Sequence, residues 1–172
     1  MPRLHVCSLA LIDETVTQTG ARSLVTLLSP GTRVERPGAI APERHLYLAV
    51  SDIIEAAPGQ ALPERGHLED LLDFIRAWDR AEPMVIHCFA GVSRSTAAAF
   101  IAACALAPDR SEFEIARAIR AASPTASPNS RLVALADAAL GRRGRMSAAI
   151  AEIGPGAACF EGTPFALELE LT

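Results

Sequence analysis

Lysine is absent from this chain of 172 residues, so all 16 of its basic side chains are arginines. Aromatic residues make up only 5% of the sequence, with one tryptophan and one tyrosine. The 20 acidic residues outnumber the basic ones and give a formal net charge of −4. A nucleic-acid binder normally presents a basic face, so this composition argues against that class. Abundant alanine beside an arginine-only set is typical of a GC-rich genome and predicts a bacterial source.

Long hydrophobic runs are also missing. The longest apolar run, residues 96–108, falls far short of the roughly 20 residues that a transmembrane helix needs. The opening segment MPRLHVCSLALIDE has neither the apolar run nor the small-residue cleavage site of a secretory signal. We therefore expect a soluble, cytoplasmic protein that does not associate with a membrane.

The cysteines are few and widely separated, at Cys7, Cys88, Cys104 and Cys159. They form no CxxC pair and no zinc-ligand spacing, so we expect reduced thiols and no metal site. Half of the residues are hydrophobic and 21% are charged, which is ordinary globular composition. The length fits one domain with a full core.

Strand-like and helix-like segments alternate along the chain, which predicts a single α/β domain. The run MVIHC at 84–88 is apolar except for its histidine and is typical of a central strand covered on both faces. The sequence therefore predicts a central, mostly parallel sheet flanked by helices. The expected strands are 3–11, 23–29, 44–50 and 84–88, and the expected helices are 13–20, 67–80, 95–107, 111–122 and 129–140.

The ends of several elements carry their own signals. We expect Asp13 to cap the first helix and Gly20 to close it. Residues 30–43 are rich in proline and glycine and predict a loop. Strict alternation in FALELEL at 165–171 predicts an extra, half-exposed C-terminal strand.

The most informative segment is MVIHCFAGVSRSTAAAF, residues 84–100, in which an apolar strand leads through a short loop into a helix. In α/β sheets, ligands bind at the carboxyl ends of strands. The following helix begins with unpaired N–H groups and a partial positive charge, which favour phosphate. Gly91 allows the backbone to turn, and Arg94 can bind two phosphate oxygens at once. The segment therefore predicts a phosphate-binding loop.

Cys88 is placed at the mouth of this loop, in the positive field of the helix terminus and Arg94. Such a field favours the thiolate, and a thiolate facing a bound phosphate is a nucleophile facing an electrophile. The transition-state charge would be stabilised by Arg94 and by the backbone N–H groups of the loop. The expected phosphate-binding residues are Phe89, Ala90, Gly91, Val92, Ser93 and Arg94.

Residues His87–Ser95 follow the pattern HCxxGxxR[ST]. This pattern resembles the phosphate-binding loop of the cysteine-dependent protein tyrosine phosphatases, most closely that of their compact dual-specificity branch. The resemblance is clearest over 23–140 and implies a phosphotyrosine-phosphatase-like fold. We expect residues 1–140 to form the phosphatase-like domain and 141–172 to be an extension packed on it.

The resemblance implies roles for the residues that flank the cysteine. His87 would orient the loop and support the thiolate through hydrogen bonds. Ser95 would donate a hydrogen bond to the sulfur of Cys88 and help it to leave in the second step. The alternative for Ser95 is a simple helix cap.

A proton donor is needed for a leaving group of high pKa. In the family this general acid is an aspartate on a loop some thirty-odd residues before the cysteine, just after a strand. The segment HLYLAVSDIIE places Asp52 there, 36 positions before Cys88. Asp52 therefore resembles the general acid, with Glu55 as its rival.

The remaining candidates have plainer interpretations. Asn129 in SPNSRLVALAD is most simply a helix N-cap, with a role at the pocket as the alternative. Cys104 is expected in the core, and the arginine run 142–145 on a solvated face. A reversible disulfide from Cys7 or Cys159 to Cys88 would protect the thiolate from over-oxidation, and the sequence leaves it open.

Together these features predict a metal-independent cysteine-based phosphatase that needs no cofactor and is a monomer or weak homodimer. Its substrate would be a phosphorylated protein, on tyrosine, serine or threonine, or a small phosphorylated metabolite. The leading alternative is a non-catalytic phosphate-binding module. A sulfur-transfer domain of rhodanese type is disfavoured, because such loops usually lack an arginine six positions after the cysteine.

Overall fold

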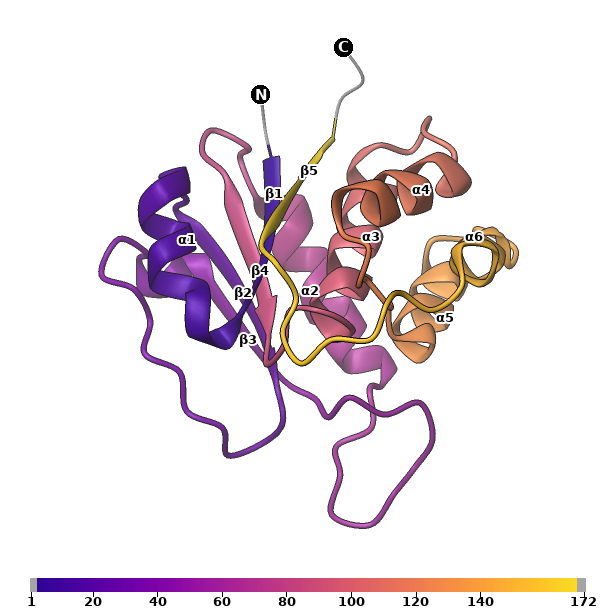
Figure 1. Cartoon of the computed structure of the whole chain (residues 1–172), viewed down its shortest axis with the longest axis horizontal. Coiled ribbons are helices and arrows are strands. Elements are labelled where there is room, and N and C mark those ends of the chain that lie inside the picture. The colour runs from indigo at the N-terminus through magenta and orange to yellow at the C-terminus, as the bar shows by residue number, and fades with distance from the viewer. Residues whose placement is uncertain (1–2, 170–172) are drawn as a thin grey trace.

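The structure, a computed structural model, describes residues 3–169. One sheet of five strands forms the centre of the molecule, in the order β3-β2-β4-β1-β5 (Figure 1). The first four strands are parallel to their neighbours, and β5 pairs antiparallel with β1. This confirms the predicted α/β domain with its extra C-terminal strand. The strands are β1 Arg3–Ser8, β2 Ser23–Leu28, β3 His45–Ala49, β4 Met84–Cys88 and β5 Phe165–Glu168.

Helices cover both faces of this sheet. A small apolar cluster lies under the first helix, and a larger one lies between the sheet and the other five helices. Within residues 3–169, no helix is long and apolar enough to span a bilayer. The helices are α1 Ile12–Thr19, α2 Arg65–Ala77, α3 Arg94–Leu106, α4 Glu112–Ala122, α5 Ser130–Ala139 and α6 Arg145–Ile153, with 3-10 turns at Leu9–Leu11 and Pro42–Arg44.

The centre of the core is the pair β4 and α3, which the phosphate loop connects. All five residues of β4 are buried, as the apolar run predicts. Helix α3 is buried from Arg94 to Cys104. A helix that is apolar on every side is expected inside a fold, and its many alanines allow close packing. The loop between these two elements therefore starts and ends on rigid, buried backbone.

The first and last expected elements differ from the structure in their ends. The first strand stops at Ser8, because residues 9–11 form a 3-10 turn. Gly20 closes α1 in the left-handed conformation, as expected. The prediction that Asp13 caps this helix is wrong: it lies inside the first turn, where its charge still favours the helix dipole. The last strand is assigned over 165–168, and residues 170–171 of the predicted strand lie outside the described residues.

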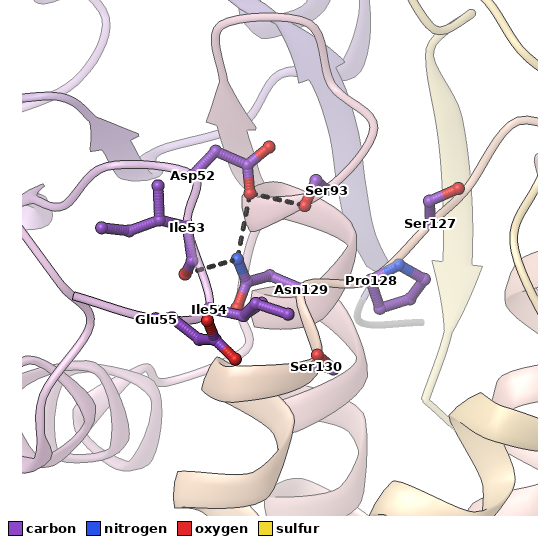
Figure 2. A pocket seen from close by; sticks show the side chains of 9 residues that line it. All are labelled: Asp52, Ile53, Ile54, Glu55, Ser93, Ser127, Pro128, Asn129 and Ser130. Atoms are coloured by element: carbon purple, nitrogen blue, oxygen red, sulfur yellow. Dashed lines mark hydrogen bonds between the residues drawn. The ribbon is translucent and has the colours of Figure 1, made fainter. Parts of the chain in front are cut away.

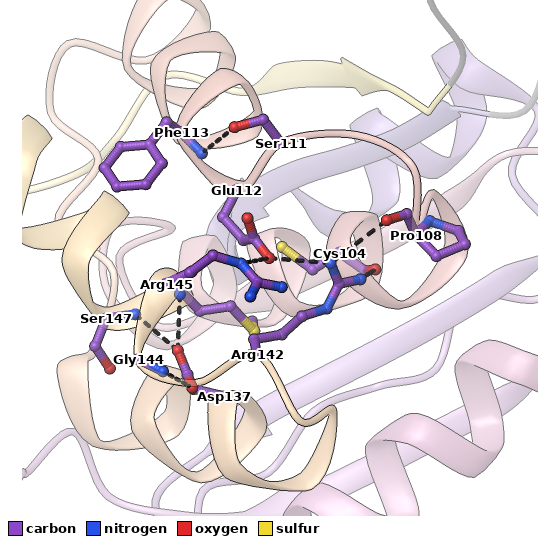
Figure 3. Close-up of polar contacts among 11 residues, drawn as sticks. Cys104, Pro108, Ser111, Glu112, Phe113, Asp137, Arg142, Gly144, Arg145 and Ser147 are labelled. Carbon is purple, nitrogen blue, oxygen red and sulfur yellow. Dashed lines mark hydrogen bonds and ion pairs between the residues drawn. The ribbon is translucent and has the colours of Figure 1, made fainter.

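The arginine run after α5 is the predicted solvated face only in part: Arg143 and Arg145 are exposed, but Arg142 is not. The side chain of Arg142 is only 12% exposed and forms an ion pair with the buried Glu112 (3.0 Å; Figure 3). Its other nitrogen donates to the carbonyl oxygen of Cys104 (2.6 Å). Arg145 also pairs with Glu112, at 3.2 Å. The buried carboxylate of α4 thus binds the start of α6, a helix that the sequence analysis did not predict.

Helix α6 is capped by a side chain from another helix. Its N-cap residue, Gly144, has no side chain to accept hydrogen bonds. Asp137 of α5 replaces it, accepting the N–H groups of Gly144 (2.6 Å), Met146 (2.7 Å) and Ser147 (3.2 Å). The start of α6 is therefore set by tertiary structure, which explains why no local signal predicts it.

The ion pair of Arg142 with Glu112 supplies a test of this packing. We expect Arg142→Ala to lower the free energy of unfolding by about 3 kcal/mol, because it leaves a buried carboxylate with only one partner. Arg76→Ala, an exposed position on α2, is the matched control and should cost less than about 0.5 kcal/mol. Urea denaturation curves measure both variants. Equal effects would contradict a buried ion pair.

Candidate active site

The loop between β4 and α3, residues 89–93, lies at the carboxyl end of the central strand. Its sharpest constraint is at Gly91, which has φ of +72°. A Cβ there would lie 2.8 Å from the carbonyl carbon of Cys7 and 2.9 Å from the nitrogen of Ser8. Only glycine allows the loop to lie against the end of β1 in this conformation.

The backbone carbonyl groups of the loop are held by segments that surround it. Four of the five accept a hydrogen bond from outside the loop, from the residue after β1, from the approach to α5 and from the segment before β5. The bonds are Leu9 N–H to Phe89 O (3.1 Å), Gly162 N–H to Ala90 O (2.8 Å), Ser127 N–H to Val92 O (2.9 Å) and Asn129 N–H to Ser93 O (3.1 Å).

This carbonyl anchoring orients the N–H groups. In a trans peptide unit the C=O and the following N–H point in opposite directions. Each carbonyl held from outside therefore turns the next N–H toward the interior of the loop. The N–H groups of residues 89–93 donate no hydrogen bond to any described residue. Free N–H groups converging in a loop form an anion-binding nest, the chemistry that the sequence predicts.

The first turn of α3 adds to this nest because it is left uncapped. Ser93 is the N-cap residue, but its side chain makes no capping hydrogen bond. Its hydroxyl donates instead to Oδ1 of Asp52, at 2.7 Å. Thr96 supports the turn by donating to the carbonyl oxygen of Val92, at 2.6 Å. The positive end of the helix therefore remains available to an anion.

Cys88 ends β4 at the base of the loop and is 2% exposed. Its Sγ lies 3.1 Å from Oγ of Ser95. Ser95 is the second residue of α3 and not its cap, so the alternative interpretation of this serine is wrong. The hydroxyl is placed to donate a hydrogen bond to the sulfur, as the resemblance implies.

Arg94 is 7% exposed, and its guanidinium is held through one nitrogen, Nη1. Its Nη1 donates to the carbonyl oxygen of Val50 (2.9 Å) and approaches Oγ of Ser29 (3.4 Å). Its Nε is buried without a hydrogen-bond partner among residues 3–169. Buried N–H groups are rarely left unpaired, so this donor is suited to a bound oxyanion.

His87 begins a buried hydrogen-bond chain that crosses three strands. Its Nε2 lies 2.7 Å from Oγ1 of Thr26 on β2, which lies 2.8 Å from Nε2 of His45 on β3. Its Nδ1 lies 3.1 Å from the carbonyl oxygen of Cys88. Burial lowers the pKa of His87 to about 4, so the ring is neutral near pH 7.

A neutral His87 allows one consistent placement of the protons in this chain. Nδ1–H donates to the carbonyl of Cys88, so Nε2 must accept the hydroxyl proton of Thr26. The oxygen of Thr26 then accepts Nε2–H of His45. The carbonyl of Cys88 is thereby fixed just before the loop begins, in agreement with the orienting role that the resemblance implies.

Asp52, which follows β3, is held against the loop. Its Oδ1 accepts hydrogen bonds from Ser93 and from Nδ2 of Asn129, at 2.7 and 3.0 Å (Figure 2). Asn129 also donates to the carbonyl of Ile53 (3.2 Å). Its Oδ1 accepts the N–H groups of the first turn of α5, which confirms the expected N-cap. The contact between Asn129 and Asp52 is the feature that sequence reasoning left as the lesser alternative.

A cavity of about 490 Å³ opens beside this contact. The exposed Glu55 lines it but makes no hydrogen bond to a described residue, so of the two rival acids only Asp52 contacts the loop. Cys88 and Arg94 are not part of the cavity lining. The cavity is lined by Asp52, Ile53, Ile54, Glu55, Ser93, Ser127, Pro128, Asn129 and Ser130 (Figure 2).

The other three cysteines differ from Cys88 in their surroundings. Cys7 is paired in register with His87, so its side chain lies on the opposite face of the sheet from Cys88 and in the other apolar cluster. A disulfide between Cys7 and Cys88 would require the backbone to move. Cys104 is fully buried, as expected, and burial raises its pKa to about 12. Cys159 is exposed. Residues 3–169 contain no cluster of three or more His, Cys, Asp or Glu side chains that could hold a metal ion.

The depressed pKa of His87 predicts how stability depends on pH. The unfolded chain binds this proton near pH 6.5, whereas the folded protein does not bind it until about pH 4. The contribution of neutral His87 to the free energy of unfolding should therefore be complete above pH 6.5. It should fall by about 3 kcal/mol as the pH is lowered toward 4. Urea titrations across this range measure the fall.

His87→Gln should flatten this dependence on pH. His67→Gln, at the start of α2 and outside the buried chain, is the control and should leave it in place. An unchanged slope in His87→Gln would contradict a buried neutral His87.

Comparisons with known proteins agree with this geometry. A sequence model described as protein-tyrosine phosphatase matches residues 58–125, which include the whole loop but not Asp52. No curated protein matches the chain significantly.

Several solved structures with the same fold are dual-specificity phosphatases. Human DUSP28 is 20% identical, with 81% of this chain and 94% of that chain covered and a TM-score of 0.61. A putative mouse dual-specificity phosphatase, in complex with zinc tungstate, is 21% identical over 86% of both chains, with a TM-score of 0.61. DUSP15 is 18% identical over 87% of this chain and 90% of that chain, with a TM-score of 0.62. The matched segment and the shared fold show that this chain is similar to the cysteine-based protein tyrosine phosphatases and has the fold of their dual-specificity form.

Proposed function

We propose that this chain is a phosphatase that hydrolyses phosphate monoesters through a phosphocysteine intermediate. The observation that carries the proposal is a set of unpaired donors around a buried thiol. The free N–H groups belong to residues 89–93, the loop that follows Cys88, and the unpaired Nε belongs to Arg94, the first residue of α3. These donors suit the three non-bridging oxygens of a phosphate monoester.

In the first step, the thiolate of Cys88 attacks phosphorus in line with the leaving oxygen. A P–S bond forms and the P–O bond to the leaving group breaks. Asp52 gives its proton to that oxygen, so the product leaves as an alcohol or phenol. Arg94 and the loop N–H groups stabilise the charge on the equatorial oxygens.

In the second step, water attacks the phosphocysteine and Asp52, now a carboxylate, takes its proton. The P–S bond breaks, phosphate is released and Cys88 returns as a thiolate. The hydroxyl of Ser95, 3.1 Å from the sulfur, donates a hydrogen bond that stabilises this thiolate. Apart from the attacking water, these two steps use only side chains and backbone groups of the protein.

The substrate belongs to one of two groups, phosphorylated proteins or small phosphorylated molecules. The cavity beside the loop, about 490 Å³ in volume, would receive the part of the substrate beyond the phosphate. Its lining includes two carboxylates, Asp52 and Glu55, and no arginine. This lining disfavours a substrate with a second phosphate near the first, because like charges repel.

The direct test is hydrolysis of an aryl phosphate in the presence of a chelator. We expect turnover by the wild type, no turnover by Cys88→Ser, and a loss of roughly a hundredfold in kcat for Asp52→Asn, the scale of a lost general acid. Asp73→Asn, at an exposed aspartate on α2, is the matched control and should retain full activity. A wild type that binds vanadate without turnover would favour the alternative, a non-catalytic phosphate-binding module.

Asn129→Asp separates the two roles of Asn129. The new carboxylate keeps the acceptor that caps α5, but it loses the amide that donates to Asp52 and Ile53 and places a charge against Asp52. We expect kcat to fall about tenfold while the thermal midpoint changes by only a few degrees. A loss of stability with unchanged kcat would limit Asn129 to capping. Steady-state kinetics and thermal unfolding measure the two effects.

A further inference from the structure

The chain between α6 and β5, residues 154–164, contains no helix or strand. We call it the C-terminal strap. Figure 1 shows it leaving α6, passing the end of the sheet where the phosphate loop lies and turning up into β5. The mechanism proposed above assigns no role to this segment.

The beginning of the strap is tied to the backbone that leads to α5. Arg120 donates to the carbonyl oxygens of Gly154 (2.8 Å) and Ala126 (2.9 Å). The N–H of Gly156 donates to Oγ of Ser127, at 2.9 Å. The N–H of Ser127 also donates to the carbonyl oxygen of Val92, so Ser127 connects this end of the strap to the loop.

The middle of the strap contacts the loop directly, at Gly162. Its N–H donates to the carbonyl oxygen of Ala90, at 2.8 Å. A Cβ at this buried position would lie 3.0 Å from the carbonyl oxygen of Gly91 and 3.3 Å from Cγ2 of Val92. The φ of Gly162 is not in the left-handed region, so glycine is needed here only for close approach.

The residue just before Gly162 is fixed to β1. The carboxylate of Glu161 accepts a hydrogen bond from the hydroxyl of Ser8, which is paired in register with Cys88. Strand β5 follows and pairs with β1. The N–H of Leu9, just beyond β1, holds the carbonyl of Phe89. Gly162 is therefore held in place from both sides.

We propose that the C-terminal strap is a positioning element of the phosphate-binding loop and that Gly162 is its positioning residue. By holding the carbonyl of Ala90 outward, Gly162 turns the N–H of Gly91 toward the bound phosphate. The strap touches no substrate and acts only through this peptide unit. The inference rests on the proposed function for its kinetic readout, whereas anion binding tests it independently.

The experiment compares Gly162→Ala with Gly38→Ala in the full chain. A Cβ at Gly38 meets nothing within 4 Å, and its φ is not left-handed, so it is a matched control. We expect Gly162→Ala to weaken orthovanadate binding by about tenfold, the scale of one hydrogen bond to an anion, and to lower kcat/KM similarly. The thermal midpoint should change by only a few degrees, and Gly38→Ala should match the wild type.

Unchanged vanadate affinity in a folded Gly162→Ala variant would overturn the proposal. If Gly162→Ala does not fold, Glu161→Gln provides the test, because it weakens the neighbouring contact to Ser8 without adding bulk. About a threefold loss of vanadate affinity in Glu161→Gln would support the strap's role, and no loss would overturn it. A wild type that binds vanadate without turnover would refute the proposed phosphatase but leave the vanadate comparison valid.

Discussion

The anchoring of the loop carbonyls is the constraint on which the rest of the structure depends. A loop of five residues with free N–H groups has no internal hydrogen bonds to hold its shape. Its geometry is imposed through its carbonyls, by donors at Leu9, Ser127, Asn129 and Gly162. These donors come from segments far apart in the sequence, so the sheet and the helices must all be in place for the loop to take this form.

Ser93 contributes to the site and does not stabilise the helix that follows it. A serine at an N-cap usually stabilises its helix by about 1 kcal/mol. Here its hydroxyl is directed to Asp52, and the first turn of α3 remains uncapped. Burial of the alanine-rich helix against β4 offsets this cost, because most of the stability of a helix in a protein comes from packing. The same serine thus joins the acid to the loop and leaves the helix terminus open.

Features that depend on local spacing could be predicted from the sequence. The apolar run predicted β4, Gly91 predicted the turn of the loop, and the alternation of strand-like and helix-like segments predicted the α/β sheet. The placement of Asp52 came from the family resemblance. Features that depend on distant partners could not be predicted. The start of α6 depends on Asp137 of another helix, and the burial of Arg142 depends on Glu112 of α4.

The site shows the same division between local and distant information. The cap formed by Asn129 is local and was expected. Its amide reaches Asp52 across 77 positions of sequence, and no pattern in either segment signals that contact. Gly162 is similar, because a single glycine in an irregular segment carries no sign of what approaches it. Only the packed fold shows which side chain would be excluded there.

The pairing of β5 with β1 has a consequence for the order in which the chain matures during synthesis. The four parallel strands are complete once residue 88 has been made, and these strands and the helices after them can begin to collapse as the ribosome continues. The donor at Gly162 and the edge strand that follows it arrive about seventy residues later. After residue 129 has been made and until residue 162 follows, the nascent chain holds Cys88 and Arg94 beside a loop lacking one of its four anchors. Closing this long-range contact is expected to be among the slow steps of folding, because distant segments must be brought together at an entropic cost. Full anion affinity would therefore appear late, after the edge strand has docked.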